Sequence, residues 1–134
     1  MEPERLALFA IVALKRALRL RRNTDFQRVR QHGRKTASRL LVLIYAPNNL
    51  ANVRVGFVVS KRISKQAVER NYVKRLLSEA IRPLLLDIPA GWDIIVSVKQ
   101  TIVGIPLSAL TQDLYMVLRR AQLFASPSTE GSQS

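Results

Sequence analysis

Residues 53–82 read VRVGFVVSKRISKQAVERNYVKRLLSEAIR, and the period of the hydrophobic pattern changes within this stretch. In residues 53–60, β-branched and aromatic side chains predominate, which predicts a strand. In residues 66–82, apolar side chains recur three and four positions apart, which predicts a helix with one buried face. They are Val73, Leu76, Leu77, Ala80 and Ile81. Pro83 is expected to end or kink this helix, because its ring removes a donor and crowds the preceding turn.

The segment upstream predicts a short helix and a longer strand. Thr24 and Gln27 have the spacing of a capping box, and Gly33 is placed to end that helix in the left-handed conformation. Residues 35–46, KTASRLLVLIYA, are rich in aliphatic side chains and predict a strand. The turn signal in residues 47–49, PNN, favours an antiparallel hairpin between this strand and residues 53–60.

The segment downstream predicts one more strand and one more helix. Residues 92–98, WDIIVSV, follow a Pro-Ala-Gly break and predict a strand. A last helix is expected over residues 108–123, with Ser108 as its N-cap. The order is then helix, strand, strand, helix, strand, helix. This order indicates an α+β fold, in which helices cover a small sheet.

Positive charge is concentrated in the first two thirds of the chain. Lys and Arg number 22 against 9 acidic residues, so the net charge is +13. Ten of the basic residues lie within residues 15–39 and eight within residues 54–82. Such an imbalance in a small domain indicates a polyanionic partner. Nucleic acid is the first candidate, and an anionic membrane surface is the second.

The residue inventory gives little support to catalysis by the protein itself. The absence of Cys excludes disulfides, thiolate catalysis and sulfur-ligated metals, and it fits a reducing cytosol. His32 is the single histidine, and its position beside Gly33 fits a surface or helix-capping role. The acidic residues are scattered, with no motif of a nuclease centre among them. They include Asp25, Glu69, Asp87, Asp93 and Asp113.

Composition divides the chain into three segments. Residues 1–14 contain the apolar run LALFAIVAL, which is too short to span a bilayer and lacks the flanks of a signal peptide. We interpret them as an N-terminal extension outside the core. Residues 15–124 are interpreted as the nucleic-acid-binding domain. Residues 125–134, ASPSTEGSQS, are small and polar and are predicted to be disordered.

The polar residues of the predicted middle helix form two adjacent rows. Arg70, Lys74 and Ser78 lie one turn apart, and Asn71 and Arg75 form the second row, so we expect them opposite the apolar stripe. A solvated helix face is the ordinary explanation of such a pattern. Here, however, nearly all the charges have one sign and acidic partners four residues away are few. The pattern therefore favours an anion-binding face, in which Arg grips phosphate bidentately and Lys adds a mobile charge.

Two segments of the chain resemble a known family. Residues 55–62, VGFVVSKR, followed by residues 69–76, ERNYVKRL, resemble the signature of the ribonuclease P protein family, in which a strand with a Gly and a basic pair precedes an Arg-Asn-x-x-Lys-Arg helix. Residues 25–29, DFQRV, with Gly33, resemble the first helix of the family. The similarity covers about residues 15–124. The Arg-Asn-x-x-Lys-Arg string alone is weak evidence for the family. Its placement after the strand and downstream of the first-helix segment makes the match specific.

The resemblance implies a fold, an activity and partners. The fold is a compact α/β sandwich with a small mixed sheet and a left-handed β-α-β crossover, against the usual right-handed rule. The family sheet has four strands where the pattern predicts three, and a break within residues 35–46 would supply the fourth. The activity is that of the protein subunit of an endoribonuclease that removes the 5′ leader of precursor tRNA. The chemistry is expected to belong to the catalytic RNA subunit and its Mg²⁺, with no cofactor bound by the protein alone. The expected partners are that RNA and precursor tRNA, in the cytoplasm, with no required protein partner and no stable membrane association.

The resemblance also assigns residues to two contacts. The contact with the RNA subunit is assigned to Lys61, Arg62, Lys65, Arg70, Asn71, Lys74 and Arg75. The contact with the leader, in a cleft between the first helix and the sheet, is assigned to Phe26, Arg30 and Phe57. Stacking of an unpaired base on an aromatic ring is sequence-tolerant, which suits leaders of many sequences.

Several of these residues also fit a structural role or depart from the family pattern. Phe26 and Phe57 fit plain core packing, and Gly56 fits a close approach within a strand. Tyr72 fits either the edge of the core or a contact with RNA. Arg30, Ile44 and Ser78 stand where some relatives have an aromatic residue, a Tyr and an Arg. Tyr45 should face away from Ile44, because side chains alternate along a strand.

Two alternatives from other functional classes remain open from the residues alone. Small basic chains are common among ribosomal and other structural RNA-binding proteins. Binding to a membrane surface through residues 6–14 and the basic cluster that follows is the other alternative.

Overall fold

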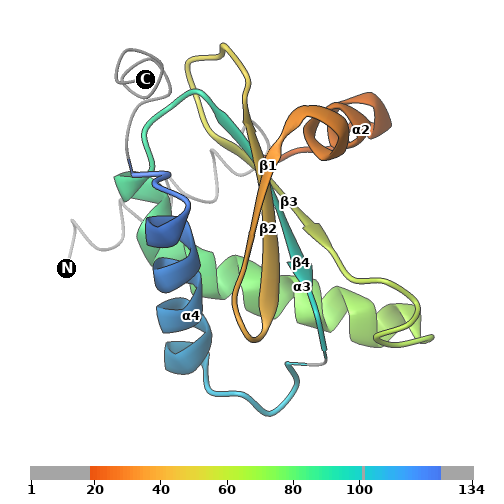
Figure 1. The fold of residues 1–134 in the computed structure, drawn as a ribbon. Coiled ribbons are helices and arrows are strands. Elements are labelled where there is room, and N and C mark those ends of the chain that lie inside the picture. The colour runs from red at the N-terminus through yellow and green to blue at the C-terminus, as the bar shows by residue number, and fades with distance from the viewer. Residues whose placement is uncertain (1–18, 101, 125–134) are drawn as a thin grey trace, which may run out of the picture.

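The structure, a computed structural model, describes residues 19–100 and 102–124. The predicted N-terminal extension and the predicted polar tail lie outside the described residues. Figure 1 shows a sheet with helices on both sides. The elements in chain order are α2 (Asn23–His32), β1 (Arg34–Ala37), β2 (Leu41–Pro47), β3 (Arg54–Val58), α3 (Ala67–Ile81), the 3-10 helix η1 (Arg82–Asp87), β4 (Trp92–Val98) and α4 (Leu107–Arg120).

The four strands form one mixed sheet in the order β1-β2-β4-β3. The β1–β2 and β2–β4 pairs are antiparallel, whereas β3 and β4 are parallel. The expected hairpin between β2 and β3 is therefore wrong, because β4 lies between them. The hairpin is instead β1–β2, since the single strand expected over residues 35–46 is divided by a turn at residues 38–40. In this turn the Ser38 hydroxyl accepts a hydrogen bond from the Leu41 N–H at 3.1 Å.

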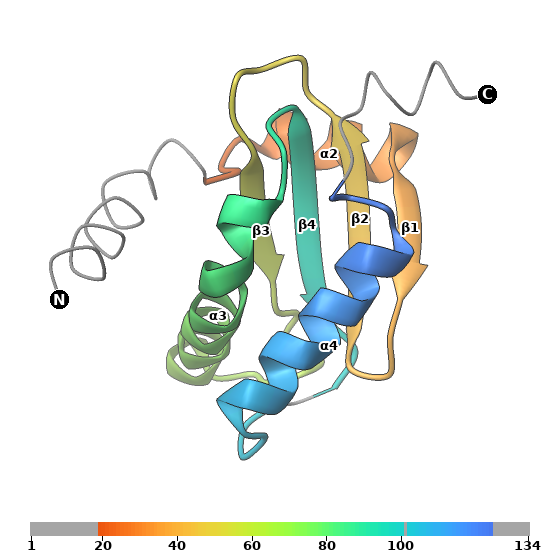
Figure 2. The same cartoon turned by 90° about the vertical axis from the view of Figure 1, so that its left-hand side faces the viewer.

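The connection from β3 through α3 to β4 is left-handed. In Figure 2 the helices α3 and α4 lie in front of the sheet, β3 and β4 both run downward, and β4 lies to the right of β3. With the helix toward the viewer and the strands pointing down, an advance to the right is the left-handed sense. The crossover implied by the family resemblance is thus present, against the right-handed rule that nearly all parallel connections obey.

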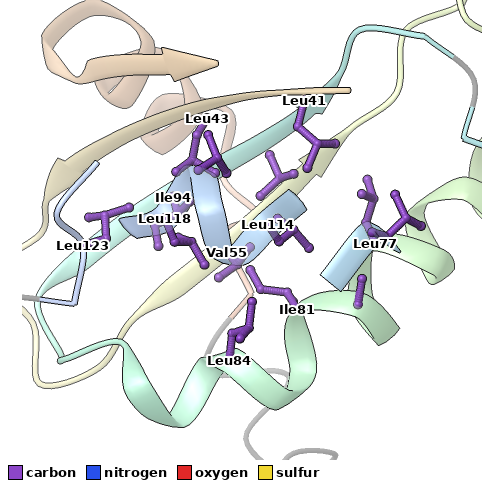
Figure 3. Packing of buried hydrophobic residues seen from close by; sticks show 14 of the residues in the cluster. Leu41, Leu43, Val55, Leu77, Ile81, Leu84, Ile94, Leu114, Leu118 and Leu123 are labelled. Atoms are coloured by element: carbon purple, nitrogen blue, oxygen red, sulfur yellow. The ribbon is translucent and has the colours of Figure 1, made fainter. Parts of the chain in front are cut away.

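The two faces of the sheet bury different clusters. The larger cluster lies between the sheet and α3 with α4, and Figure 3 shows ten of its residues labelled, among them Leu43, Leu77 and Leu114. The smaller cluster lies under α2 and contains Leu20, Val29, Ala46 and Ile95. Strand alternation decides the face: Tyr45 packs in the larger cluster, edge-on to Trp92 at 6.0 Å, whereas Ile44 packs under α2. The expected opposition of these two side chains is confirmed.

The ends of the helices differ from expectation more than their positions do. Helix α2 begins at Asn23 without a side-chain cap, so the capping box at Thr24 and Gln27 is wrong. Gly33 is extended, with φ −83° and ψ 168°, and the left-handed stop is wrong as well. Glycine is required there for space, because a β-carbon would lie 2.4 Å from the Val29 carbonyl oxygen and 2.6 Å from that of Tyr45.

The ends of the other two helices are set by proline. Ser108 is inside α4, which begins at Leu107 after Pro106, so the expected N-cap at Ser108 is wrong. Helix α3 ends at Ile81, and Pro83 lies in the first turn of η1, as expected for a residue that stops the longer helix. No helix among the described residues is long and apolar enough to cross a membrane.

Candidate nucleic-acid interface

A groove of about 550 Å³ runs along the outer edge of β3, between the start of α2 and the polar side of α3. Strand β3 is the last strand of the sheet. The segment just before α2 extends that edge, since the Leu20 N–H donates to the Val55 carbonyl oxygen at 3.1 Å. The lining residues are Arg19, Leu20, Arg21, Phe26, Val55, Gly56, Phe57, Asn71, Lys74, Arg75, Ser78, Ile81, Arg82 and Leu85. The groove therefore combines three segments that are distant in sequence.

The floor of the groove depends on a glycine. The ring of Phe26 lies directly over Gly56, where a β-carbon would be 2.5 Å from Cζ and 3.2 Å from the β-carbon of Leu20. The sequence prediction that Gly56 allows a close approach is confirmed. Phe26 is half-buried and belongs to the cluster under α2, so its ring both packs against the sheet and borders the groove.

The walls of the groove are positively charged. Its lining includes the five cationic side chains of Arg19, Arg21, Lys74, Arg75 and Arg82 and no carboxylate. An apolar floor with aromatic rings between cationic walls is the arrangement that holds a single-stranded nucleic acid, because bases stack on the rings while the cations meet the phosphates. The groove is thus chemically suited to an extended polyanion with unpaired bases.

The structure brings five of the predicted contact residues together. Phe26, Phe57, Asn71, Lys74 and Arg75 all line the groove. Phe57 packs against the larger cluster, on the opposite face of the sheet from Phe26. The two rings meet the same groove because it lies at the sheet edge.

Other predicted contact residues lie outside the groove. Lys61, Arg62 and Lys65 are exposed in the loop between β3 and α3, and Arg30 is exposed on α2. The residues assigned to the RNA subunit therefore form two groups, one in the loop and one on α3. Arg30 is separated from the leader residues with which it was grouped.

Arg70 differs from the other basic residues of α3. It is half-buried, and its Nη1 donates to the Ser64 carbonyl oxygen at 3.0 Å. The expectation that Arg70 lies on the face opposite Leu77 is therefore wrong. The two side chains are seven residues apart, close to two full turns, so they share a face of the helix. Arg70 organises the β3–α3 loop that carries the exposed Lys61, Arg62 and Lys65.

A buried carboxylate that sequence reasoning did not single out anchors α2 to the sheet. Asp93 on β4 is fully buried, and Arg54 lies directly across from it on β3. Arg54 donates to both carboxylate oxygens, at 2.8 Å and 2.7 Å, Asn48 donates at 2.8 Å, and Arg28 from α2 also bonds to Asp93. Burial alone would raise the pKa of Asp93, but the hydrogen bonds from Arg54 and Asn48 and the charges of the two arginines lower it below its ordinary value.

The ion-pair cluster around Asp93 has a structural role. Asp25 on α2 also pairs with Arg54, at 3.5 Å, so two carboxylates that are scattered in the sequence meet around one guanidinium. The hydrogen bonds that Arg54 donates to Asp93, together with the negative charges of Asp93 and Asp25, raise the pKa of Arg54, which stays charged. In the described part of the chain, no group of three or more His, Cys, Asp or Glu residues is placed to hold a metal ion.

Sequence reasoning also missed three groove residues. Arg19 and Arg21 precede the predicted first helix, and Arg82 follows the motif-bearing turns of α3. Their positive charge was visible in the sequence, but the approach of Arg19 and Arg21 to β3 follows from the pairing of Leu20 with Val55, and that of Arg82 from the packing of α3 and η1 beside the groove. Ser78, noted as a departure from the family pattern, lines the same groove.

Fold and groove together define a small, basic α+β protein with a left-handed crossover and a cationic, aromatic-lined groove at the sheet edge. Comparison with known proteins is more specific. The sequence profile of the Ribonuclease P family matches residues 14–122. The chain is 40% identical over 118 residues to the ribonuclease P protein component of Chloroflexus aggregans, covering 87% of each chain. It is 33% identical over 111 residues to that of Thermoanaerobacter sp., covering 83% of this chain and 95% of the relative.

Solved structures agree with the sequence relatives. The RNase P protein of Staphylococcus aureus superposes with a TM-score of 0.71 at 32% identity, covering 81% of this chain and 98% of that one. The RNase P protein of Thermotoga maritima superposes with a TM-score of 0.69 at 26% identity, covering 76% and 96%. The chain belongs to the ribonuclease P protein family, and is thus a protein subunit of that endoribonuclease. Nothing in the comparisons supports the alternative of a ribosomal or other structural RNA-binding protein.

Proposed function

We propose that this chain contacts the catalytic RNA of ribonuclease P through α3 and the β3–α3 loop, and holds the 5′ leader of precursor tRNA in the groove along β3. The observation that carries the proposal is the groove itself, where two aromatic rings and five cations, without a carboxylate, border one hollow. A leader is single-stranded and varies in sequence. Stacking on rings and pairing of phosphates with cations tolerate that variation, because every base has a π-face and every nucleotide a phosphate.

The protein binds and orients the precursor tRNA, and the RNA subunit hydrolyses the phosphodiester with its own Mg²⁺. Cations along the leader and on α3 neutralise phosphates that would otherwise repel one another when substrate and catalytic RNA meet. The protein therefore lowers the concentration of magnesium that the holoenzyme requires. We place this work in the cytoplasm, together with the RNA subunit, with no required protein partner and no stable membrane association.

Reconstitution tests the proposal. The full chain is combined with a bacterial ribonuclease P RNA at a low magnesium concentration, and cleavage of a precursor tRNA is followed. We expect the protein to stimulate release of the leader, and the Lys74→Ala/Arg75→Ala double variant to stimulate it less. Arg39→Ala is the control, because Arg39 is an exposed cation in the β1–β2 turn outside the groove. Absence of stimulation by the wild-type chain would overturn the proposal.

A further inference from the structure

The outer side of the first turns of α3 carries two exposed apolar side chains within the most basic stretch of the helix. Val68 is 80% exposed and Tyr72 is 45% exposed. They lie one turn apart and border a shallow hollow whose other lining residues are Gln66, Glu69, Asn71 and Arg75. Asn71 and Arg75 also line the β3 groove, so the two hollows meet on α3.

Core packing does not account for Tyr72. The buried residues of α3 are Val73, Leu77, Ala80 and Ile81, which lie about 80–180° around the helix axis from Tyr72. The aromatic ring pairs found among the described residues are Tyr45 with Trp92 and Tyr115 with Phe124, and Tyr72 belongs to neither. A half-exposed ring beside a valine is unfavourable on a merely solvated helix face, because apolar surface stays in contact with water.

We propose that the ring of Tyr72 stacks on an unpaired base of the RNA that α3 binds; this inference rests on the function proposed above. Successive residues of a helix are separated by 100°, so around the axis Tyr72 lies between Arg75 and Glu69. A base on the ring then has a guanidinium on one side for its phosphate and a carboxylate on the other.

Glu69 gives the contact a preference among bases. A carboxylate only accepts hydrogen bonds, so it pairs favourably with an exocyclic amino group of cytosine, adenine or guanine, whereas uracil offers it only the N3–H between two carbonyl oxygens that the carboxylate repels. The Tyr72 hollow is therefore a base-selective contact next to the sequence-tolerant groove.

Fluorescence tests the stacking directly, using the full chain and a ribonuclease P RNA. Tyr72→Trp introduces an indole at the hollow, while the native Trp92 is 3% exposed and gives a constant background. We expect the emission of the new indole to be quenched when RNA is added. Tyr115→Trp is the matched control, because Tyr115 is 40% exposed on α4, and its emission should not change. An unquenched indole at position 72 in a variant that still binds the RNA would overturn the inference.

Two further substitutions separate this inference from the proposed function. Tyr72→Phe keeps the ring and should bind RNA as the wild type does, whereas Tyr72→Leu should bind about tenfold more weakly, as expected for loss of one stacked base. Equal binding by the Phe and Leu variants would refute the stacking alone. Failure of the wild-type chain to bind the RNA would refute the proposed function, and the stacking with it. Thermal unfolding of both variants confirms that they are folded.

Discussion

The ring of Phe26 rests on the backbone of Gly56, so closely that a β-carbon at position 56 would lie 2.5 Å from Cζ and 2.8 Å from Cε1 of that ring. One residue comes from α2 and the other from the edge strand β3. The contact fixes the position of an aromatic ring that borders the groove. The packing role expected for Phe26 is thus confirmed, and its contact with the leader stays a prediction.

Gly56→Ala should displace the ring of Phe26. We expect a loss of about 1–3 kcal/mol in the free energy of unfolding, the usual cost of an added methyl group in a packed site. Phe26→Leu lacks the atoms that clash, so the cost of Gly56→Ala should be smaller in that background. Urea unfolding of the wild type, both single variants and the double variant measures the coupling. Strictly additive costs would contradict the contact.

Asp93→Asn should be strongly destabilising. The substitution leaves Arg54 and Arg28 without the carboxylate that both contact, and breaking such a pair from one side costs about 3 kcal/mol. Glu79→Gln is the control: Glu79 pairs with Arg82 at 3.3 Å at the surface, and its loss should cost less than about 1 kcal/mol. Similar unfolding free energies for the two variants would argue against an anchoring role for Asp93.

The Asp93 carboxylate should make the stability of the protein sensitive to acid. The pKa of Asp93 is lower in the folded chain than in the unfolded one, so its stabilising contribution is present above the unfolded pKa of about 3.9. That contribution is lost as the pH falls through the lowered folded pKa. Urea unfolding between pH 5 and pH 2 should therefore show a steeper loss of stability in the wild type than in Asp93→Asn. Parallel curves would contradict the lowered pKa.

The basic residues of α3 should divide into two groups, those whose loss weakens RNA binding and one whose loss destabilises the fold. Lys74→Ala and Arg75→Ala should each reduce the slope of log affinity for RNA against log salt concentration by about 0.7, the value for one contact to single-stranded nucleic acid. Neither substitution should change the melting temperature of the protein. Arg70→Ala should lower the melting temperature, because it removes the hydrogen bond to the Ser64 carbonyl. Filter binding and thermal unfolding on the same samples test this division. Unchanged slopes for both Lys74→Ala and Arg75→Ala would remove α3 from the interface.

The elements best predicted from sequence are those whose pattern is local. The helix expected over residues 66–82 is Ala67–Ile81, and the strand expected over residues 92–98 is Trp92–Val98. The break within residues 35–46 could not be located from the sequence, because the turn at residues 38–40 contains Ser, Arg and Leu, without the Gly, Pro or Asn that marks a turn. The expected hairpin was wrong because β4, about forty residues later in the chain, pairs with both β2 and β3. Local turn signals carry no information about such an insertion.

The candidate interface was predictable to the extent that charge and motif are local. The contiguous motif on α3 indicated Lys74 and Arg75, and the first helix indicated Phe26. The pairing of Arg28, Arg54 and Asp93 was not predictable, since 65 and 39 residues separate Asp93 from its two partners. The structural role of Arg70 was hidden for a different reason, because its partner is a backbone carbonyl that no sequence pattern marks.

The most direct test of the leader groove is the preference of the reconstituted holoenzyme for precursor tRNA over mature tRNA. Phe26→Leu keeps an apolar side chain under α2 but removes the ring that borders the groove. With the wild-type protein, the precursor should bind more tightly than the mature tRNA. With Phe26→Leu, this preference should fall by about tenfold, as expected for loss of one stacked base, while Arg39→Ala leaves it intact. A preference that is the same for the wild type and Phe26→Leu would contradict the assignment of the leader to this groove.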